Sequence, residues 1–129
     1  MSELKPKVGD NIFVYGTLRP GCRAYYMLEG KTEHLGRSTL GNAALFSLGA
    51  FPGLKIVDNS TVTGDLFKVV DESVFARLDQ YEGYPHFYDR KLLDTPEGPA
   101  WTYVFQGDVK DEDKIMSGDW LNRGKDARG

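Results

Sequence analysis

The sequence contains a single cysteine, Cys22, and only two histidines, His34 and His86. One thiol excludes an intramolecular disulfide and any metal site built from several cysteines. The two histidines are far apart in the chain, and no third ligand residue follows either of them at a spacing typical of zinc sites. We therefore expect a protein that uses no metal ion and no other cofactor.

The sequence also lacks an excess of basic residues and any long apolar run. Nineteen acidic residues outnumber sixteen Lys and Arg residues, the net charge is −3, and the one weak basic cluster is Arg123, Lys125 and Arg128. Nucleic-acid surfaces need a basic face, membrane spans need about 20 apolar residues, and secretion signals need an apolar segment near the N-terminus. We therefore expect a cytoplasmic protein that binds neither nucleic acid nor membranes.

Several common catalytic patterns are missing as well. No stretch carries the Gly-Lys-Ser/Thr of a nucleotide-binding loop or the three glycines of a dinucleotide fingerprint. Ser47, Ser60 and Ser73 do not lie in a nucleophile-elbow pattern, and Cys22 has no histidine at a recognisable spacing. The sequence gives no support to catalysis by a serine or cysteine nucleophile.

What is present is the composition of an ordinary globular domain, with 40% hydrophobic and 27% charged residues among 129. We predict one domain over residues 1–129, with a core from about 11 to 121 and flexible ends at 1–10 and 122–129. A chain of this length can bury its own core, so we expect a monomer.

Local patterns predict a β-rich α+β domain of five to seven strands and two or three helices, which can curl into a small barrel. The predicted strands cover residues 11–15, much of 33–48, 61–69, 87–93 and 100–105. Gly36 and Gly41 interrupt the second of these and indicate bulges or tight bends. A turn is predicted at Phe51-Pro52-Gly53 and a short helix at 23–28.

A longer helix is predicted to begin at the capping residue Asp71 and to end at Gly83. Val74, Phe75 and Leu78 fall on one face of this helix, which is the pattern of a helix packed against a core.

Glu82 is the last residue of that predicted helix and is followed closely by Tyr84 and Phe87. The helix C-terminus carries partial negative charge, and nearby aromatic rings exclude water, so both disfavour the ionised carboxylate. We predict a raised pKa for Glu82, in the range useful for proton transfer. The alternatives are that Glu82 merely decorates a helix end, or that Asp79 joins it as a second carboxylate for glycosidase-like chemistry. Asp79 can instead face solvent or hold a local hydrogen bond.

The first predicted strand opens into the glycine turn Tyr15-Gly16-Thr17-Leu18-Arg19-Pro20-Gly21. Successive backbone N–H groups at such a turn can bind an anion such as a carboxylate, although a plain strand-to-turn junction is the alternative. Tyr88 and Arg90 alternate along a later strand and so point to one side of it, where they line either a pocket or a polar sheet face.

Taken together, these segments resemble the γ-glutamylcyclotransferase-like superfamily, especially its small members akin to γ-glutamylaminecyclotransferase and the AIG2-like proteins. The resemblance runs from about Ile12 to Trp120 and rests on the order and spacing of its motifs. The motifs are Phe13-Val14-Tyr15-Gly16-Thr17-Leu18-Arg19-Pro20-Gly21, Phe51-Pro52-Gly53, Thr63-Gly64-Asp65-Leu66-Phe67, Leu78-Asp79-Gln80-Tyr81-Glu82-Gly83 with Tyr88 and Arg90, Ala100-Trp101-Thr102-Tyr103-Val104, and Ser117-Gly118-Asp119-Trp120.

The resemblance implies a small mixed β-barrel flanked by two or three helices. It also implies that Glu82 is the general acid/base and that the loop Tyr15-Gly16-Thr17-Leu18 binds the substrate, and we add Tyr88 to the substrate-binding residues. The implied reaction is attack of a γ-glutamyl substrate's α-amine on its own γ-carbonyl, which releases 5-oxoproline and a free amine without a metal. Two alternatives stay open: removal of a γ-glutamyl group from a biosynthetic intermediate, and a non-catalytic module that binds a small carboxylate.

Overall fold

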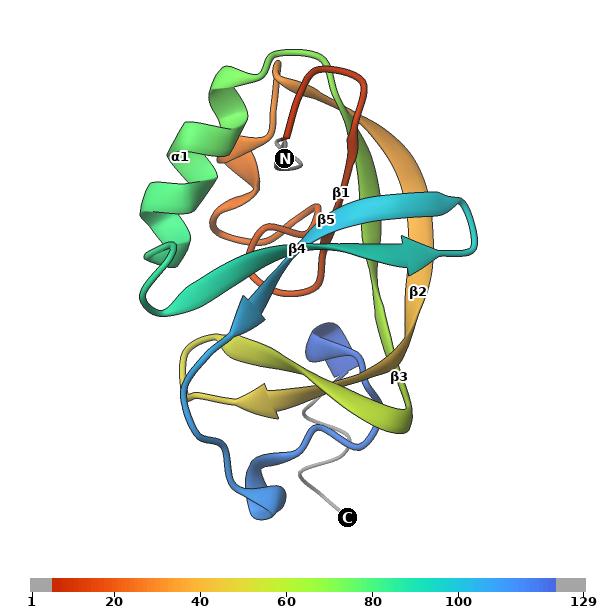
Figure 1. Ribbon diagram of the computed structural model, residues 1–129, viewed down its shortest axis with the longest axis vertical. Helices are drawn as coiled ribbons and strands as arrows, with labels where there is room; N and C mark the ends of the chain where they lie inside the picture. Colours follow the sequence, from red (N-terminus) through yellow and green to blue (C-terminus); the bar gives the residue numbers. More distant parts are fainter. Residues whose placement is uncertain (1–5, 123–129) are drawn as a thin grey trace, which may run out of the picture.

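The computed structural model describes residues 6–122, which form five strands, one α-helix and three short 3₁₀ turns (Figure 1). The strands are β1 (Asn11–Val14), β2 (Thr32–Ser47), β3 (Pro52–Val69), β4 (Tyr88–Thr95) and β5 (Gly98–Phe105). The helix is α1 (Ser73–Glu82), and the 3₁₀ turns are η1 (Tyr25–Met27), η2 (Asp111–Asp113) and η3 (Trp120–Asn122). The predictions made for residues 1–5 and 123–129, including the basic cluster, lie outside the described residues.

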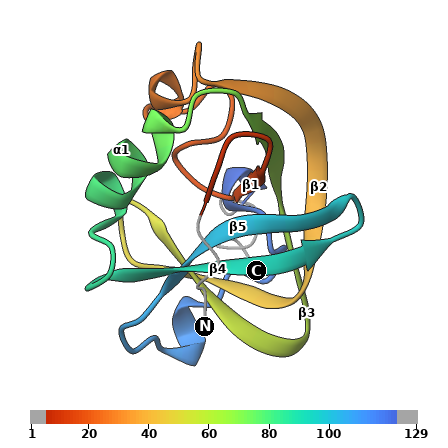
Figure 2. The ribbon, with the colours of Figure 1, turned by 45° about the horizontal axis from the view of Figure 1, so that its top comes forward.

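The strands form one mixed sheet in the order β2-β3-β1-β5-β4. β1 pairs parallel with β5 and antiparallel with β3, and the ladders β2–β3 and β4–β5 are antiparallel. In Figures 1 and 2 the β4–β5 hairpin runs across the long β2–β3 hairpin, so the sheet is strongly curved. The α+β class is confirmed. The barrel is not confirmed, because no ladder among the described strands joins the edge strands β2 and β4.

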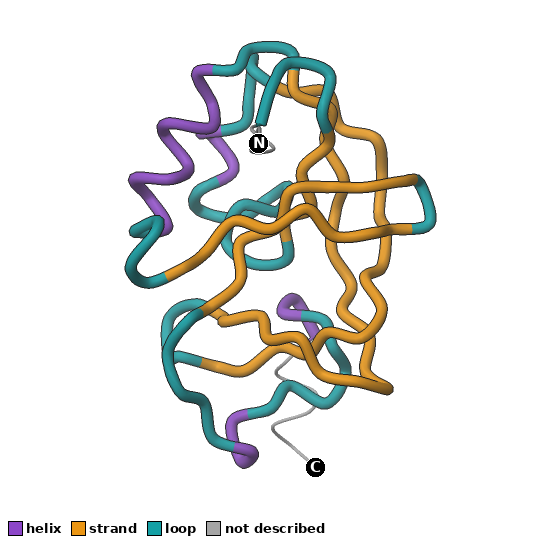
Figure 3. Tube along the Cα trace, viewed as in Figure 1, coloured by secondary structure: helices purple, strands orange, loops and turns teal. Residues whose placement is uncertain are grey.

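β1 lies in the middle of the sheet and is buried on both faces. Its side chains alternate, so Ile12 and Val14 belong to one hydrophobic cluster, and Phe13 belongs to a second. The helix α1 packs Leu78 and its neighbours into the first cluster and lies along one side of the strands (Figure 3). β1 therefore carries the chain through the interior, and the loop that follows it begins inside the protein.

The β2–β3 hairpin bends because its ladder is interrupted twice. Register shifts occur between His34 and Gly36 and between Gly41 and Ala43, so the predicted bulges are confirmed. The predicted position of the hairpin turn is wrong: Pro52 already pairs with Ser47 in the ladder, and the turn precedes it. The bend brings this turn beside the end of β5 (Figure 1).

Helix α1 ends where its sequence predicts, but its N-cap is Glu72 and not the predicted Asp71, and the helix begins at Ser73. The Asp71 carboxylate accepts the Ser73 N–H at 3.0 Å at the start, and Gly83 adopts the left-handed conformation with φ of 70° at the end. Glu82 is thereby fixed as the last helical residue. The helix predicted at 23–28 is only the 3₁₀ turn η1.

Candidate active site

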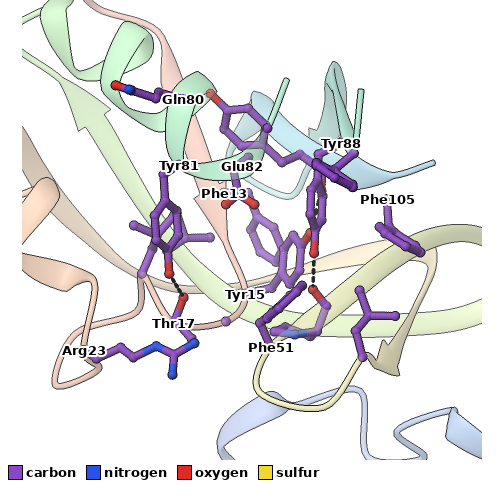
Figure 4. A pocket seen from close by; sticks show the side chains of 18 residues that line it. Phe13, Tyr15, Thr17, Arg23, Phe51, Gln80, Tyr81, Glu82, Tyr88 and Phe105 are labelled. Carbon is purple, nitrogen blue, oxygen red and sulfur yellow. Dashed lines mark hydrogen bonds between the residues drawn. The ribbon is translucent and has the colours of Figure 1, made fainter. Parts of the chain in front are cut away.

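A cavity of about 650 Å³ opens where the end of β1, the C-terminus of α1 and the turn of the β2–β3 hairpin meet (Figure 4). All the site residues proposed from the sequence line this cavity: Tyr15, Gly16, Thr17, Leu18, Glu82 and Tyr88. The other lining residues are Phe13, Val14, Arg23, Leu48, Phe51, Pro52, Gln80, Tyr81, Gly83, Phe87, Tyr103 and Phe105. Segments from both halves of the sequence therefore build one site.

Glu82 contributes a carboxylate that the protein does not neutralise. Figure 4 shows the Glu82 side chain between the rings of Tyr81 and Phe13. No donor within residues 6–122 makes a hydrogen bond or ion pair with its carboxylate. Burial alone raises the pKa of Glu82 from 4.5 to about 7. The direction agrees with the sequence prediction, and the cause is loss of water around the carboxylate.

Two buried phenols lie in the electrostatic field of Glu82. Burial and then the Glu82 charge raise the pKa of Tyr15 and of Tyr88 well above the usual range, so both hydroxyls stay protonated. Tyr15 donates to the Tyr103 carbonyl at 2.6 Å, and Tyr88 donates to the Pro52 carbonyl at 2.9 Å. Because these protons are directed away from Glu82, the two phenol oxygens remain available as acceptors for a cation.

The loop after β1 presents backbone N–H groups along the cavity. Within residues 6–122, the N–H groups of Gly16, Thr17 and Leu18 have no protein acceptor. The Thr17 hydroxyl shares a 2.8 Å hydrogen bond with the Tyr81 hydroxyl, which joins the loop to the end of α1. A side chain at Gly16 would place its Cβ 2.7 Å from Pro52 Cγ, so the loop lies directly against the start of β3. This geometry suits an anion such as a carboxylate.

An ion network that the sequence did not predict holds this loop from behind. Arg19 is only 1% exposed, and its guanidinium donates to Asp65 at 2.8 Å and to Asp119 at 2.6 Å. His34 contacts the second oxygen of Asp65 at 3.0 Å. Asp65 belongs to β3 and Asp119 to the segment before η3, so three distant segments meet at one arginine. The sequence signal that could have indicated this network is that Arg19, Asp65 and Asp119 all lie in motifs that carry the family resemblance.

With this geometry in place, comparison with known proteins identifies the family. A sequence profile of the family described as "Gamma-glutamyl cyclotransferase, AIG2-like" matches residues 12–122. The chain belongs to this γ-glutamylcyclotransferase family. The γ-glutamylcyclotransferase family protein YtfP of Escherichia coli strain K12 is 39% identical over 115 residues, which are 88% of this chain and 98% of that protein. The solution structure of the E. coli protein aligns with a TM-score of 0.68 at 35% identity, again over 88% and 98% of the two chains.

Two further relatives extend the comparison of this family member. The crystal structure of PH0828 from Pyrococcus horikoshii aligns with a TM-score of 0.78 over 92% of this chain and 96% of that chain, and at 23% identity it shows the fold alone. A protein of Niallia circulans named γ-L-glutamyl-butirosin B γ-glutamyl cyclotransferase is 28% identical over 108 residues, or 76% of this chain and 68% of that protein.

In this γ-glutamylcyclotransferase family member, Asp79 does not form a carboxylate pair with Glu82. Asp79 accepts a 2.6 Å hydrogen bond from the Tyr103 hydroxyl and an ion pair from Arg90, and it does not line the cavity. Asp79 therefore holds hydrogen bonds, but to β4 and β5 and not to residues near it in the sequence. Arg90, expected on the same side as Tyr88, is occupied by this ion pair. The glycosidase-like arrangement of two carboxylates around one substrate bond is not formed.

Residues 6–122 contain no group of three or more His, Cys, Asp or Glu side chains arranged to hold a metal ion. Within the same residues, no helix has both the length and the apolar composition of a membrane span. The chemical groups that the cavity offers include one carboxyl, several phenol oxygens, one guanidinium and a row of backbone N–H groups.

Proposed function

We propose that this protein catalyses the cyclisation of γ-glutamyl amides to 5-oxoproline and a free amine, with Glu82 as general acid/base. The observation that carries the proposal is the partly buried, unpaired Glu82 carboxyl with a pKa of about 7, in a cavity beside the free N–H groups of residues 16–18. A carboxyl that titrates near neutral pH can accept and return a proton in one catalytic cycle.

Substrate binding follows from the two polar sides of the cavity. The N–H groups of Gly16, Thr17 and Leu18 bind the α-carboxylate of the glutamyl group. The α-ammonium then lies near Glu82 and the phenol oxygens of Tyr15 and Tyr88, which can accept hydrogen bonds from it. Both charged ends of the glutamyl group are thereby held while the γ-carbonyl remains in the cavity.

The first chemical step uses Glu82 as a base. Its carboxylate takes a proton from the α-ammonium, and the neutral nitrogen attacks the γ-carbonyl carbon of the same molecule. A five-membered ring closes on a tetrahedral centre. Because nucleophile and electrophile are already tethered, orientation by the protein lowers the barrier without a covalent enzyme intermediate.

The second step uses the protonated Glu82 as an acid. The carboxylic acid gives its proton to the departing amide nitrogen as the bond from that nitrogen to the γ-carbon breaks. The ring nitrogen still carries one proton too many after its attack, and Glu82 passes this second proton to the amine, which leaves as an ammonium ion. The amide is converted to one 5-oxoproline and one amine, and water is not consumed. Glu82 returns to the carboxylate form, ready for the next substrate.

The test is the release of 5-oxoproline from a panel containing γ-glutamyl dipeptides, glutathione, ε-(γ-glutamyl)lysine and γ-glutamyl diamines. We expect wild type to release 5-oxoproline from at least one compound and Glu82→Gln to lower kcat by about 10²- to 10⁴-fold. Glu72→Gln, exposed at the other end of α1, is the matched control and should match wild type. Turnover retained in Glu82→Gln would contradict the acid/base role, and compounds recovered intact from wild type would favour a binding module.

A second candidate substrate comes from the Niallia circulans relative, whose name gives a γ-glutamylated butirosin as its substrate. The same chemistry would then remove a γ-glutamyl group from a biosynthetic intermediate. Adding a γ-glutamylated aminoglycoside to the panel separates this candidate from turnover of small γ-glutamyl compounds.

A further inference from the structure

The cavity continues beyond Glu82 into an outer part that is built from apolar rings. Phe51 and Phe87 stand at its rim with 42% and 67% of their surface exposed, although large apolar side chains are usually covered. Phe105 lines the same part of the cavity. In Figure 4, Phe105 lies on the far side of the site from Thr17, and Phe51 lies between the two, beside Tyr15. If the glutamyl group lies against the loop and Glu82, this apolar part receives the leaving amine.

Positive side chains outnumber negative ones in and beside the cavity. Glu82 is the one carboxylate and Arg23 the one cationic side chain among the residues that line it. Arg23 donates to the Ala50 carbonyl at 3.3 Å, and no carboxylate of the described residues lies within ion-pair distance of it. Lys55 adds a second positive charge nearby, 5.5 Å from the centre of the Phe105 ring. The aromatic surface therefore has positive charge at two edges, from Arg23, which lies beside Thr17 and near Phe51 in Figure 4, and from Lys55 beside Phe105.

From this we infer that the leaving amine is an amino acid with an aromatic or large aliphatic side chain, whose carboxylate pairs with Arg23. The inference rests on the proposed function, because a leaving group exists only if the γ-glutamyl bond is broken. The apolar side chain covers Phe51 and Phe87 and removes their surface from water. Arg23 supplies a charge-assisted hydrogen bond to the carboxylate and acts as a specificity-determining residue.

The same arrangement discriminates against amines that carry a second ammonium group. Glu82 is engaged with the α-ammonium of the glutamyl group, so a diamine would place a second cation beside Arg23. No lining carboxylate remains to pair with that cation. Taking a charge out of water without a partner is unfavourable, so such substrates bind weakly.

The test compares three substrates that differ in one group: γ-glutamyl-phenylalanine, γ-glutamyl-phenethylamine without the carboxylate, and γ-glutamyl-diaminobutane. We expect the first to have the highest kcat/KM, by at least about fivefold over the second and more over the third. Arg23→Gln should lower kcat/KM for γ-glutamyl-phenylalanine about fivefold more than for the phenethylamine compound. Arg37→Gln, exposed on β2 and outside the cavity, is the control. An equal or higher kcat/KM for the diamine, or an equal loss for both aromatic compounds, would overturn the inference.

Direct binding separates failure of this inference from failure of the proposed function. Calorimetry on Glu82→Gln, with and without Arg23→Gln, measures the affinity for the same three compounds without turnover. If wild type releases no 5-oxoproline, the proposed function fails, but tighter binding of γ-glutamyl-phenylalanine that depends on Arg23 would still support the specificity. Equal affinities, preference for the diamine, or no binding of any compound would overturn it.

Discussion

Two carboxylates three positions apart on α1 have opposite environments, and this contrast accounts for the chemistry assigned to Glu82. Asp79 is paired with Arg90 and hydrogen-bonded to Tyr103, so its charge is compensated within the protein. Glu82 is partly buried without a donor, and its pKa rises to about 7. Placement on the same helix does not determine the role of a carboxylate; the groups around it do.

The pH dependence of the reaction tests this at the residue scale. Glu82 acts first as a base and must be ionised, so kcat/KM should fall as the pH is lowered through about 7. We expect an acid limb with an apparent pKa near that value in wild type and in Glu72→Gln. Steady-state kinetics from pH 5 to pH 9 measures it. An acid limb near 4.5, the ordinary value for a glutamate, would show that the active base is not a buried Glu82.

At the scale of elements, the loop after β1 keeps its shape because β3 and the segment before η3 hold it. Arg19 spans Asp65 and Asp119, and two glycines allow these segments to approach closely. A Cβ at Gly64 would lie 2.3 Å from the Val14 carbonyl oxygen, and one at Gly118 would lie 2.1 Å from the Thr61 carbonyl oxygen. The loop proposed to bind the substrate thus depends on residues far from it in sequence.

Replacing Arg19 should therefore affect both stability and binding. Arg19→Met removes the arginine charge from two buried carboxylates and should lower the free energy of unfolding by about 3–5 kcal/mol. Arg19→Lys keeps the positive charge, so it should be less destabilising than Arg19→Met. Because lysine lacks the planar fork that contacts both carboxylates, the loop should be held less firmly and KM should rise. Urea unfolding and KM determination measure the two effects. A loss below about 1 kcal/mol in Arg19→Met would contradict a structural role for the network.

Gly16 offers a narrower test of the contact between the loop and β3. In Gly16→Ala the new Cβ would meet the Pro52 ring at 2.7 and 2.9 Å, so the loop must shift. We expect a KM increase of about tenfold, corresponding to a displacement cost within the 1–3 kcal/mol usual for overpacking. Gly41→Ala on β2 meets open space and is the matched control. If the two variants have the same KM, the position of the loop against Pro52 does not matter for binding.

Some elements could be predicted from the sequence because their signals are local. Helix α1 was predicted correctly since its apolar face, its acidic start and its terminating Gly83 lie within one short segment. The first half of β3 was missed because Lys55, Asp58 and Asn59 are polar, and this stretch is a strand through its ladder with β2. Pairing between distant segments overrides local preference.

At the scale of the whole molecule, the sequence supplied the members of the site but not the way in which they are held. Glu82 and the loop at residues 15–18 could be proposed from a helix end, a glycine turn and a family resemblance. The partners of Arg19 could not, because Asp65 and Asp119 meet it only through tertiary structure. The outer aromatic part of the cavity was also missed, since Phe51 and Phe105 belong to strands and turns that approach one another by the bending of the β2–β3 hairpin.

The buried carboxyl should reduce the stability of the whole protein at neutral and alkaline pH. The folded state holds the Glu82 proton with a pKa of about 7, against 4.5 for an ordinary glutamate, so protonation stabilises the fold. This contribution is fully present below about pH 4.5 and is lost as the pH rises through about 7. Glu82→Gln resembles the protonated form and should be more stable than wild type by up to about 3 kcal/mol at pH 8.5.

Urea unfolding of wild type and Glu82→Gln at pH 5 and pH 8.5 measures the effect, and most of the difference should disappear at the lower pH. Glu72→Gln serves as the exposed control with little change at either pH. A difference between wild type and Glu82→Gln that does not depend on pH would contradict the raised pKa.

The central claim is that the substrate's own amine, and not water, attacks the γ-carbonyl. Turnover of γ-glutamyl-phenylalanine in water enriched in ¹⁸O, followed by mass spectrometry of the products, tests it most directly. Cyclisation predicts 5-oxoproline without ¹⁸O and one equivalent of free phenylalanine, and Glu82→Gln should form neither at a comparable rate. Glutamate carrying ¹⁸O would show hydrolysis by water and would contradict the account.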